Sequence, residues 1–356
     1  MALPDPLPAT PVGVHDGRGR FREIYRAVRE DHGRRLPDDL PCEEALRRAP
    51  GEPPPTGRPI RLGPATAPRR VLVVPGLYGE CVADLVTPFA GGLEHLAAAH
   101  GYRIGLLPVS GRSSSARNAA QVRDFLAALP AEPAERVVLV GYSKGICDAL
   151  EAIVGHDGVR RRVDAVVSVA GAVAGSALAE GVPEPLAAVL RRVDLPGCDA
   201  GDGGGIESLR RSTRRRWLAS HALPRSVRYF SLVALPEPDR VSTILRPGYR
   251  RIADHEPHND GQVAWADAVI PAGTLLGYAN ADHWAVALPI VRAAPAALRA
   301  LVATAVDRNA FPREVLLEAI VRRVEEELVG PDRGQRRTTP AWLRERISRM
   351  RVMGRG

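Results

Sequence analysis

Ser143 stands between two glycines in the sequence Gly141-Tyr142-Ser143-Lys144-Gly145. An apolar run at 137–140 precedes this pentapeptide and a helix-like pattern follows it, so the serine lies in a predicted strand–turn–helix. So sharp a turn needs almost no side chain on either side of the serine. Free backbone N–H groups at the head of a helix favour developing negative charge. The spacing predicts a nucleophilic serine; a chance serine in a buried turn is the alternative.

The residue after this serine is unusual for the composition of the chain. Lys144 is the only lysine among 49 basic residues, a bias typical of a GC-rich genome that avoids A-rich codons. A residue kept against such a bias is expected to have a function. Its side chain could approach an acidic or phosphate-bearing substrate, or simply reach solvent.

Strands and helices alternate on both sides of the pentapeptide. Apolar strands are predicted at 71–74, 104–109, 136–140 and 163–169, with helices between them, and two further strands at 227–234 and 273–278. Continuously apolar strands that alternate with helices predict an α/β fold with a mostly parallel sheet covered by helices on both faces.

The alternation stops at about 175–225, where small residues, glycines and two helical stretches replace it. An insertion of this kind is expected at the C-terminal edge of the sheet, where ligands bind in open α/β folds. We therefore predict a helical lid or cap; a plain helical excursion is the alternative.

These features together resemble the α/β-hydrolase superfamily over roughly residues 70–300. Five segments are similar to bacterial lipase- and esterase-type serine hydrolases, from a proteobacterial branch whose substrates are unassigned: 21–25, 74–76, 141–145, 169–173 and 280–284. The resemblance implies the α/β-hydrolase fold and the chain order nucleophile, acid, histidine.

His283 is the candidate catalytic histidine by this order, since it follows the last predicted strand in the sequence Asn-Ala-Asp-His-Trp. The other eight histidines fit worse, because they precede the serine, directly follow its helix, or lie in the insertion or before the last strand: His15, His32, His95, His100, His156, His221, His255 and His258.

Asp260 is the candidate acid, in a segment Asn-Asp-Gly-Gln-Val that resembles the acid-bearing segment of bacterial lipases. The resemblance implies that its carboxylate accepts a hydrogen bond from the imidazole and holds the required tautomer. Asn-Asp-Gly is also an ordinary turn sequence. Asp239, which follows the strand at 227–234, is the alternative acid, and Asp282 is weaker because adjacent side chains point apart.

The resemblance assigns the oxyanion hole to two backbone N–H groups, those of Lys144 and Leu77. Leu77 follows Pro75-Gly76, where many relatives have His-Gly, so Tyr78 is the alternative second donor.

Composition excludes several classes of function. Hydrophobic residues make up 45% of the 356 residues and charged residues 25%, as in ordinary globular proteins. No apolar run approaches the roughly 20 residues that span a bilayer. The net charge of +8 comes from short arginine clusters without interleaved aromatics, so we expect no nucleic-acid partner.

The cysteines and the N-terminus bear on the compartment. The N-terminal sequence has neither the basic region nor the apolar region that define a secretory signal, so we expect a cytoplasmic protein. The four cysteines match no metal-binding spacing, and reduced thiols are the expectation, with one or two disulfides left open: Cys42, Cys81, Cys147 and Cys198.

Three regions are predicted along the chain. Residues 1–69 form an N-terminal extension with a disordered start, short helices and a Pro-rich linker, which packs on the main domain. Residues 70–305 form the catalytic domain with the insertion, and 306–356 a helical, basic C-terminal extension. Its last predicted helix, at 339–350, could lie on a membrane surface, although docking on its own domain is favoured.

The predicted function is a serine hydrolase of the esterase or lipase type that cleaves carboxylic esters through an acyl-enzyme on Ser143. The substrate is a small-molecule or lipid-like ester, and neither a metal nor an organic cofactor is expected. The fold also hosts thioesterases and acyltransferases, and a non-catalytic binding protein is the alternative of another class. The sequence does not determine the oligomeric state.

Overall fold

A central, mostly parallel sheet is the core of the computed structural model, which describes residues 7–8, 10–65, 67, 69–130, 135–185, 187 and 198–329. The strand order is β1-β8-β7-β6-β5-β3-β4, and among the strands of the described residues only β2 pairs antiparallel, with β8. The predicted fold class is confirmed. The strands are β1 (His15–Asp16), β2 (Leu46–Arg47), β3 (Arg69–Val74), β4 (Arg103–Leu106), β5 (Arg136–Tyr142), β6 (Val163–Val169), β7 (Arg228–Ala234) and β8 (Thr274–Ala279).

The central strands are buried on both faces because their side chains alternate between two apolar clusters. Val71 and Val73 of β3 point into one cluster, and Leu72 and Val74 into the other. A strand with no polar face can be stable only between two layers of helices, as its sequence predicts.

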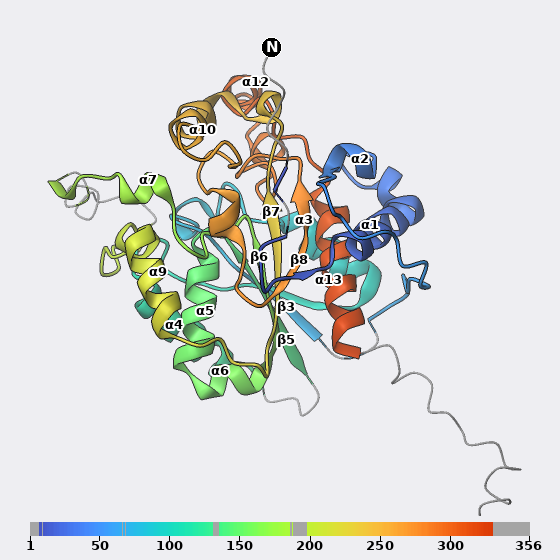
Figure 1. Ribbon diagram of the computed structural model, residues 1–356, viewed down its shortest axis with the longest axis horizontal. Helices are drawn as coiled ribbons and strands as arrows, with labels where there is room; N and C mark the ends of the chain where they lie inside the picture. The colour runs from blue at the N-terminus through green and yellow to red at the C-terminus, as the bar shows by residue number, and fades with distance from the viewer. Residues whose placement is uncertain are drawn as a thin grey trace, which may run out of the picture.

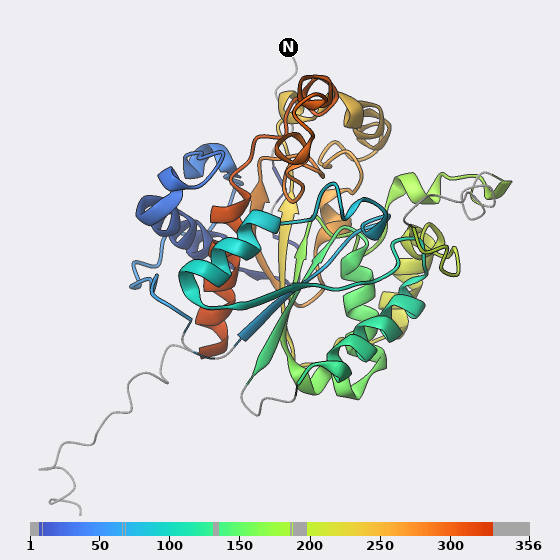
Figure 2. The ribbon, with the colours of Figure 1, turned by 180° about the vertical axis from the view of Figure 1, so that it is seen from behind.

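Two groups of helices cover the sheet, one on each face (Figures 1 and 2). One face carries α1 (Arg18–His32), α3 (Ala90–His100) and α13 (Arg313–Val329), and the other carries α4 (Ser115–Ala128), α5 (Gly145–Gly155), α6 (Asp157–Arg162) and α9 (Arg211–Ser220).

Shorter elements connect these layers. The short helices are α2 (Cys42–Ala45), α7 (Ala177–Glu180), α10 (Arg246–Ala253), α11 (Ile290–Ala293) and α12 (Arg299–Ala305). Single 3₁₀ turns are η1 (Gly33–Arg35), η2 (Glu80–Val82), η3 (Glu207–Leu209), η4 (Pro238–Arg240), η5 (Thr243–Leu245) and η6 (Trp265–Ala268). Within the described residues, no helix combines the length and apolar character that a bilayer span needs.

The N-terminal segment contributes to the sheet and core. β1 lies at the start of the N-terminal extension, which the sequence predicts to be disordered, and it pairs with β8. β2 also pairs with β8. Phe21, Ile24 and Tyr25 of α1 are fully buried in the same apolar cluster as α13. These residues therefore complete the domain. The basic helix predicted at 339–350 lies outside the described residues.

The insertion at 175–225 contains α7, η3 and α9, with residues 186 and 188–197 outside the described part. A disulfide joins Cys81 of η2 to Cys198, so the alternative of one disulfide, left open by the sequence, holds for this pair in place of reduced thiols. The two cysteines are 117 residues apart, so their spacing could not reveal the pairing. Cys42 and Cys147 are free and buried.

Candidate active site

Ser143 occupies the turn between β5 and α5 with a positive φ of 55°. That left-handed conformation is strained for a residue with a side chain, so close packing must hold it in place. A Cβ atom on Gly141 would collide with the backbone of Ile146, and one on Gly145 with the carbonyl oxygen of Val74. Both glycines are therefore required for the turn to close.

His283 connects Ser143 and Asp260 in one hydrogen-bonded chain. Its Nε2 lies 2.9 Å from the Ser143 hydroxyl oxygen, and its Nδ1 lies 2.7 Å from Oδ2 of Asp260. The loop after β8 carries the histidine, and all three residues are at least nine-tenths buried. The Tyr142 hydroxyl donates to the His283 carbonyl at 2.9 Å and fixes that loop against β5.

The two oxygens of Asp260 have separate partners. Oδ1 accepts the backbone N–H groups of Gln262 and Val263 at 2.8 and 2.7 Å, which leaves Oδ2 directed at His283. A carboxylate fixed in this way can hold Nδ1 protonated and leave Nε2 as the proton acceptor. The tight turn of Asn-Asp-Gly thus positions the acid, so its turn character and its candidate role are compatible.

The other two acids lie differently. Asp239 is exposed on η4. Asp282 is buried, and its carboxylate accepts the backbone N–H groups of Ser242 and Ala285 at 2.8 Å each. Burial raises the pKa of the Asp282 carboxyl, and the hydrogen bonds from Ser242 and Ala285 oppose that rise. Asp282 therefore shapes the loop that presents His283.

The Leu77 and Lys144 amides are available as oxyanion donors. The Tyr78 N–H donates to the Gly111 carbonyl at 3.3 Å, whereas the N–H groups of Leu77 and Lys144 donate to no acceptor within the described part of the chain. Gly76 packs directly against the Ser143 side chain, so the turn at 75–77 lies against the nucleophile. This geometry favours Leu77 over Tyr78.

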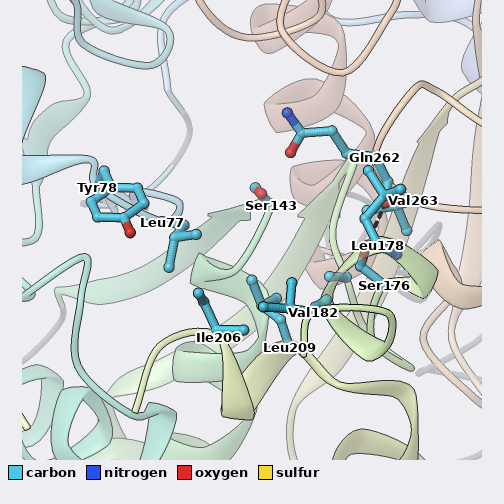
Figure 3. Close-up of a pocket in the computed structure, with 12 residues that line it drawn as sticks. Leu77, Tyr78, Ser143, Ser176, Leu178, Val182, Ile206, Leu209, Gln262 and Val263 are labelled. Carbon is cyan, nitrogen blue, oxygen red and sulfur yellow. Dashed lines mark hydrogen bonds between the residues drawn. The ribbon is translucent and has the colours of Figure 1, made fainter. Parts of the chain in front are cut away.

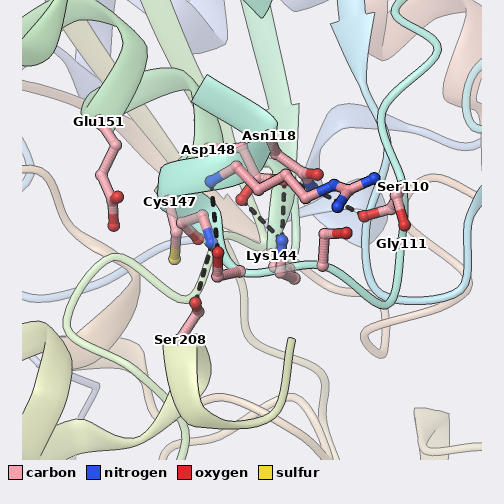
Figure 4. A network of polar contacts seen from close by, with 12 residues as sticks. Ser110, Gly111, Asn118, Lys144, Cys147, Asp148, Glu151 and Ser208 are labelled. Carbon is pink, nitrogen blue, oxygen red and sulfur yellow. Dashed lines mark hydrogen bonds and ion pairs between the residues drawn. The ribbon is translucent and has the colours of Figure 1, made fainter. Parts of the chain in front are cut away.

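The Lys144 side chain reaches neither substrate nor solvent, contrary to both sequence interpretations. It is fully buried, and its Nζ lies 2.7 and 3.0 Å from the two oxygens of Asp148 (Figure 4). The Asn118 amide donates to the same carboxylate at 2.7 Å and to the Ser110 carbonyl at 2.8 Å. This network ties α5 to α4 and to the loop before it.

An apolar cavity of about 300 Å³ opens beside Ser143 (Figure 3). Residues of the insertion form one wall, and the turn after β3 and the Asp260 loop form the others. Its lining residues are Leu77, Tyr78, Ser143, Ala172, Ser176, Leu178, Ala179, Val182, Ile206, Leu209, Gln262 and Val263. The predicted insertion therefore borders the candidate nucleophile.

A second cavity, of about 200 Å³, meets Ser143 from the other side. Val82, Val86, Trp284 and Leu288 are among its lining residues, together with His283. The serine thus lies where two apolar spaces meet, as a bond between two substrate halves would require.

Sequence reasoning missed Asp148 and Gln262. Asp148 stands four residues after Lys144 in a predicted helix, and opposite charges at that spacing are neighbours, so the signal was present. Gln262 lines both cavities because of the turn at Asp260, and no local pattern marks it.

Two solved structures show what the chain is similar to. No protein-family model and no curated protein matches the chain. The crystal structure of the metagenomic carboxyl esterase MGS0156 is 44% identical, with a TM-score of 0.84, over 92% of this chain and 97% of that one. Staphylococcus hyicus lipase, at 13% identity, shares the fold over 77% of this chain and all of that one, with a TM-score of 0.57.

Proposed function

Because the chain belongs to the carboxyl esterase and lipase family of α/β-hydrolases, we propose that it hydrolyses carboxylic esters through an acyl-enzyme on Ser143. The observation that carries the proposal is the hydrogen-bonded chain from Ser143 through His283 to Asp260, which ends at the junction of two apolar cavities. A buried serine in a merely structural turn would need neither the imidazole nor the cavities.

In the proposed mechanism Ser143 Oγ attacks the ester carbonyl carbon while His283 Nε2 takes the hydroxyl proton. Asp260 stabilises the imidazolium, and the Leu77 and Lys144 amides donate to the oxyanion. Collapse of the tetrahedral intermediate releases the alcohol, which receives the proton from His283. Water then repeats the sequence on the acyl-enzyme, giving the carboxylic acid and free Ser143.

The cavities support an uncharged, largely apolar substrate. We assign the acyl chain to the larger cavity, under the insertion, and the alcohol to the smaller one. The burial of the Lys144 side chain argues against a phosphate-bearing substrate at this site, since that ammonium group is already paired with Asp148.

The Cys81–Cys198 disulfide bears on the compartment in which the protein works. The cytoplasmic location is a prediction from the sequence, and the Cys81–Cys198 disulfide opposes it because such bonds are typical of oxidising compartments. Detection of the protein in fractionated cells of the source organism distinguishes the two locations.

Active-site labelling tests the chemistry. A fluorophosphonate probe should label the folded protein, and the labelled protein should no longer hydrolyse esters. Ser143→Ala should abolish labelling and lower kcat on p-nitrophenyl esters by about 10⁵-fold or more. Ser220→Ala, an exposed serine on α9, is the matched control and should retain both. Absence of labelling in folded wild-type protein would overturn the proposal.

A further inference from the structure

Three histidines and one glutamate meet on the face of the sheet covered by α1, α3 and α13. His32 ends α1, His95 and His100 lie on α3, and Glu318 lies on α13, the helix packed between the other two elements. One ligand atom from each of the four side chains lies within 4.8 Å of all the others. None of the four lines either cavity beside Ser143.

The side chains are arranged around a common centre. Nε2 of His95 lies 2.7 Å from Oε2 of Glu318, Nε2 of His32 contacts the same oxygen, and Nε2 of His100 lies 3.0 Å from Oε1. The ring centroids are 5.0, 5.3 and 5.7 Å apart. Three imidazoles bound to tetrahedral zinc at Zn–N distances of about 2 Å have centroids about 5 Å apart.

The cluster lies just beneath the surface. The side chains of Glu318 and His100 are 0% and 6% exposed, and those of His32 and His95 are 10% and 14% exposed. A small ion therefore has a short path to the buried carboxylate, from the side of His32 and His95.

Two of the outer contacts are of the kind that orients metal ligands, those of His32 with Asp31 and of Glu318 with Arg322. Nδ1 of His32 lies 3.2 Å from the Asp31 carboxylate, a contact of the kind that orients metal-binding imidazoles. Its Nε2 donates to Glu318 in the metal-free cluster and must give up that proton to bind an ion. Arg322 donates to Oε1 of Glu318 at 3.1 Å and to the carbonyls of Leu62 and Gly63, so Oε2 stays directed at the centre. Arg322 also lies 2.9 Å from Nδ1 and 3.3 Å from Nε2 of His100. A guanidinium only donates, so Nδ1 of His100 accepts this bond, and zinc binding at Nε2 requires Arg322 to release Nδ1.

Glu318 supplies the acidic side chain of the set. Its side chain is 0% exposed and all three imidazoles face it, so an ion at the centre would lie against one of its carboxyl oxygens.

We propose that His32, His95, His100 and Glu318 bind one structural Zn²⁺ ion that joins α1, α3 and α13. Three imidazole nitrogens and one carboxylate oxygen form a closed, four-ligand set of the kind zinc occupies in structural sites, and they disfavour the hard cations Ca²⁺ and Mg²⁺. Because four protein ligands leave no open position, the ion does not take part in ester hydrolysis. It holds the N-terminal helix and the last described helix on the sheet.

Metal content of the wild-type full-length protein is the first test. Protein expressed with added zinc and dialysed against metal-free buffer should retain about one zinc per chain by mass spectrometry of the elements. After removal of the metal with a strong chelator, Co²⁺ should restore one equivalent with the intense visible absorption of a tetrahedral site. Less than a tenth of an equivalent, with no cobalt spectrum, would overturn the proposal and leave a metal-free hydrogen-bonded cluster.

Variants locate the site. His95→Ala and Glu318→Gln should each lose the bound zinc at least tenfold, whereas His156→Ala, a half-buried histidine outside the cluster, should keep it. Chelation should lower the Tm of wild type and leave that of His95→Ala unchanged. Retention of zinc in His95→Ala would place the metal elsewhere and reject this site. Chelated wild type should keep its fluorophosphonate labelling below its Tm, so failure of this proposal is distinct from failure of the hydrolase proposal.

Discussion

Two clusters of histidine and carboxylate lie in the described part of this fold, and they differ in how many imidazoles share each acid. At the candidate active site one imidazole stands between one carboxylate and one hydroxyl, His283 between Asp260 and Ser143. In the cluster under α1, α3 and α13, three imidazoles converge on Glu318. The first borders two cavities, and the second borders neither of them.

The number of imidazoles that face each carboxylate determines what each cluster can do chemically. An imidazole with an acid on one nitrogen and a hydroxyl on the other can transfer a proton and then return it. Three imidazoles that all face one carboxylate have no hydroxyl group to activate, but they bring three nitrogen ligands and one carboxyl group close together. On the two proposals above, the same two residue types support catalysis in one place and ion binding in the other.

Removal of the negative charge from the first cluster should have the largest effect. Asp260→Asn keeps an oxygen for the Gln262 and Val263 amides but favours the wrong tautomer of His283, so kcat on p-nitrophenyl esters should fall by about 10⁴-fold. Asp239→Asn, at the exposed alternative acid, should change kcat less than twofold. Equal losses in the two variants, or a loss only in Asp239→Asn, would reverse the acid assignment.

Much of this cluster could be predicted from the sequence because each of its parts depends on local pattern. Gly141 and Gly145 mark the turn, and His283 follows an apolar strand. The mostly parallel sheet followed from strands with no polar face. The sequence favoured Asp260 over Asp239 only through a resemblance, since both follow β7. The path of the loop, which no local pattern shows, brings Asp260 to the imidazole.

The buried ion pair of Lys144 and Asp148 can be compared with both clusters, because it lies next to Ser143 and contains no histidine. Lys144→Met leaves Asp148 as an uncompensated buried charge and should lower the free energy of unfolding by about 3–5 kcal/mol in urea titrations. The folded fraction should keep most of its kcat, since the proposed oxyanion donor at this position is the backbone amide.

The double variant is the control for this pair. Lys144→Met with Asp148→Asn removes both charges and keeps an acceptor for Asn118, so it should recover much of the lost stability. A double variant no more stable than Lys144→Met would show that the two residues do not act as a pair.

The second cluster could not be predicted, for a physical reason. Its ligands come from three helices, and His32 and Glu318 are 286 residues apart. The N-terminal segment looked like an extension because its two-residue strands are too short to show a period of two. Only the packed structure shows that β1, β2 and α1 belong to the sheet and its cover, and hence that His32 faces α3 and α13.

The pH dependence of stability should separate the two clusters further. The pKa of the Glu318 carboxyl is lowered on folding, so its contribution is fully present above the unfolded value of about 4.3 and is lost as the pH falls below it. In chelated protein, Glu318→Gln should lower the free energy of unfolding by about 2 kcal/mol at pH 7 and by progressively less below about pH 4. Glu327→Gln, further along α13 and partly exposed, should show little change at either pH. A pH-independent loss in Glu318→Gln would contradict a role for the charge.

The smallest expected effect concerns the two cavities beside Ser143, which do not border the cluster around Glu318. Ile206→Trp fills part of the larger cavity, so kcat/KM should fall about tenfold for the longest acyl chain that wild type accepts and little for acetate, since the loss of a few buried methylenes costs about 1–3 kcal/mol. Val86→Trp fills the smaller cavity and should instead discriminate among alcohols of a fixed acyl group. If Ile206→Trp discriminates among alcohols and Val86→Trp among acyl chains, the assignment of the two cavities is reversed: the larger one holds the alcohol and the smaller one the acyl chain. The proposed reaction at Ser143 would be unchanged.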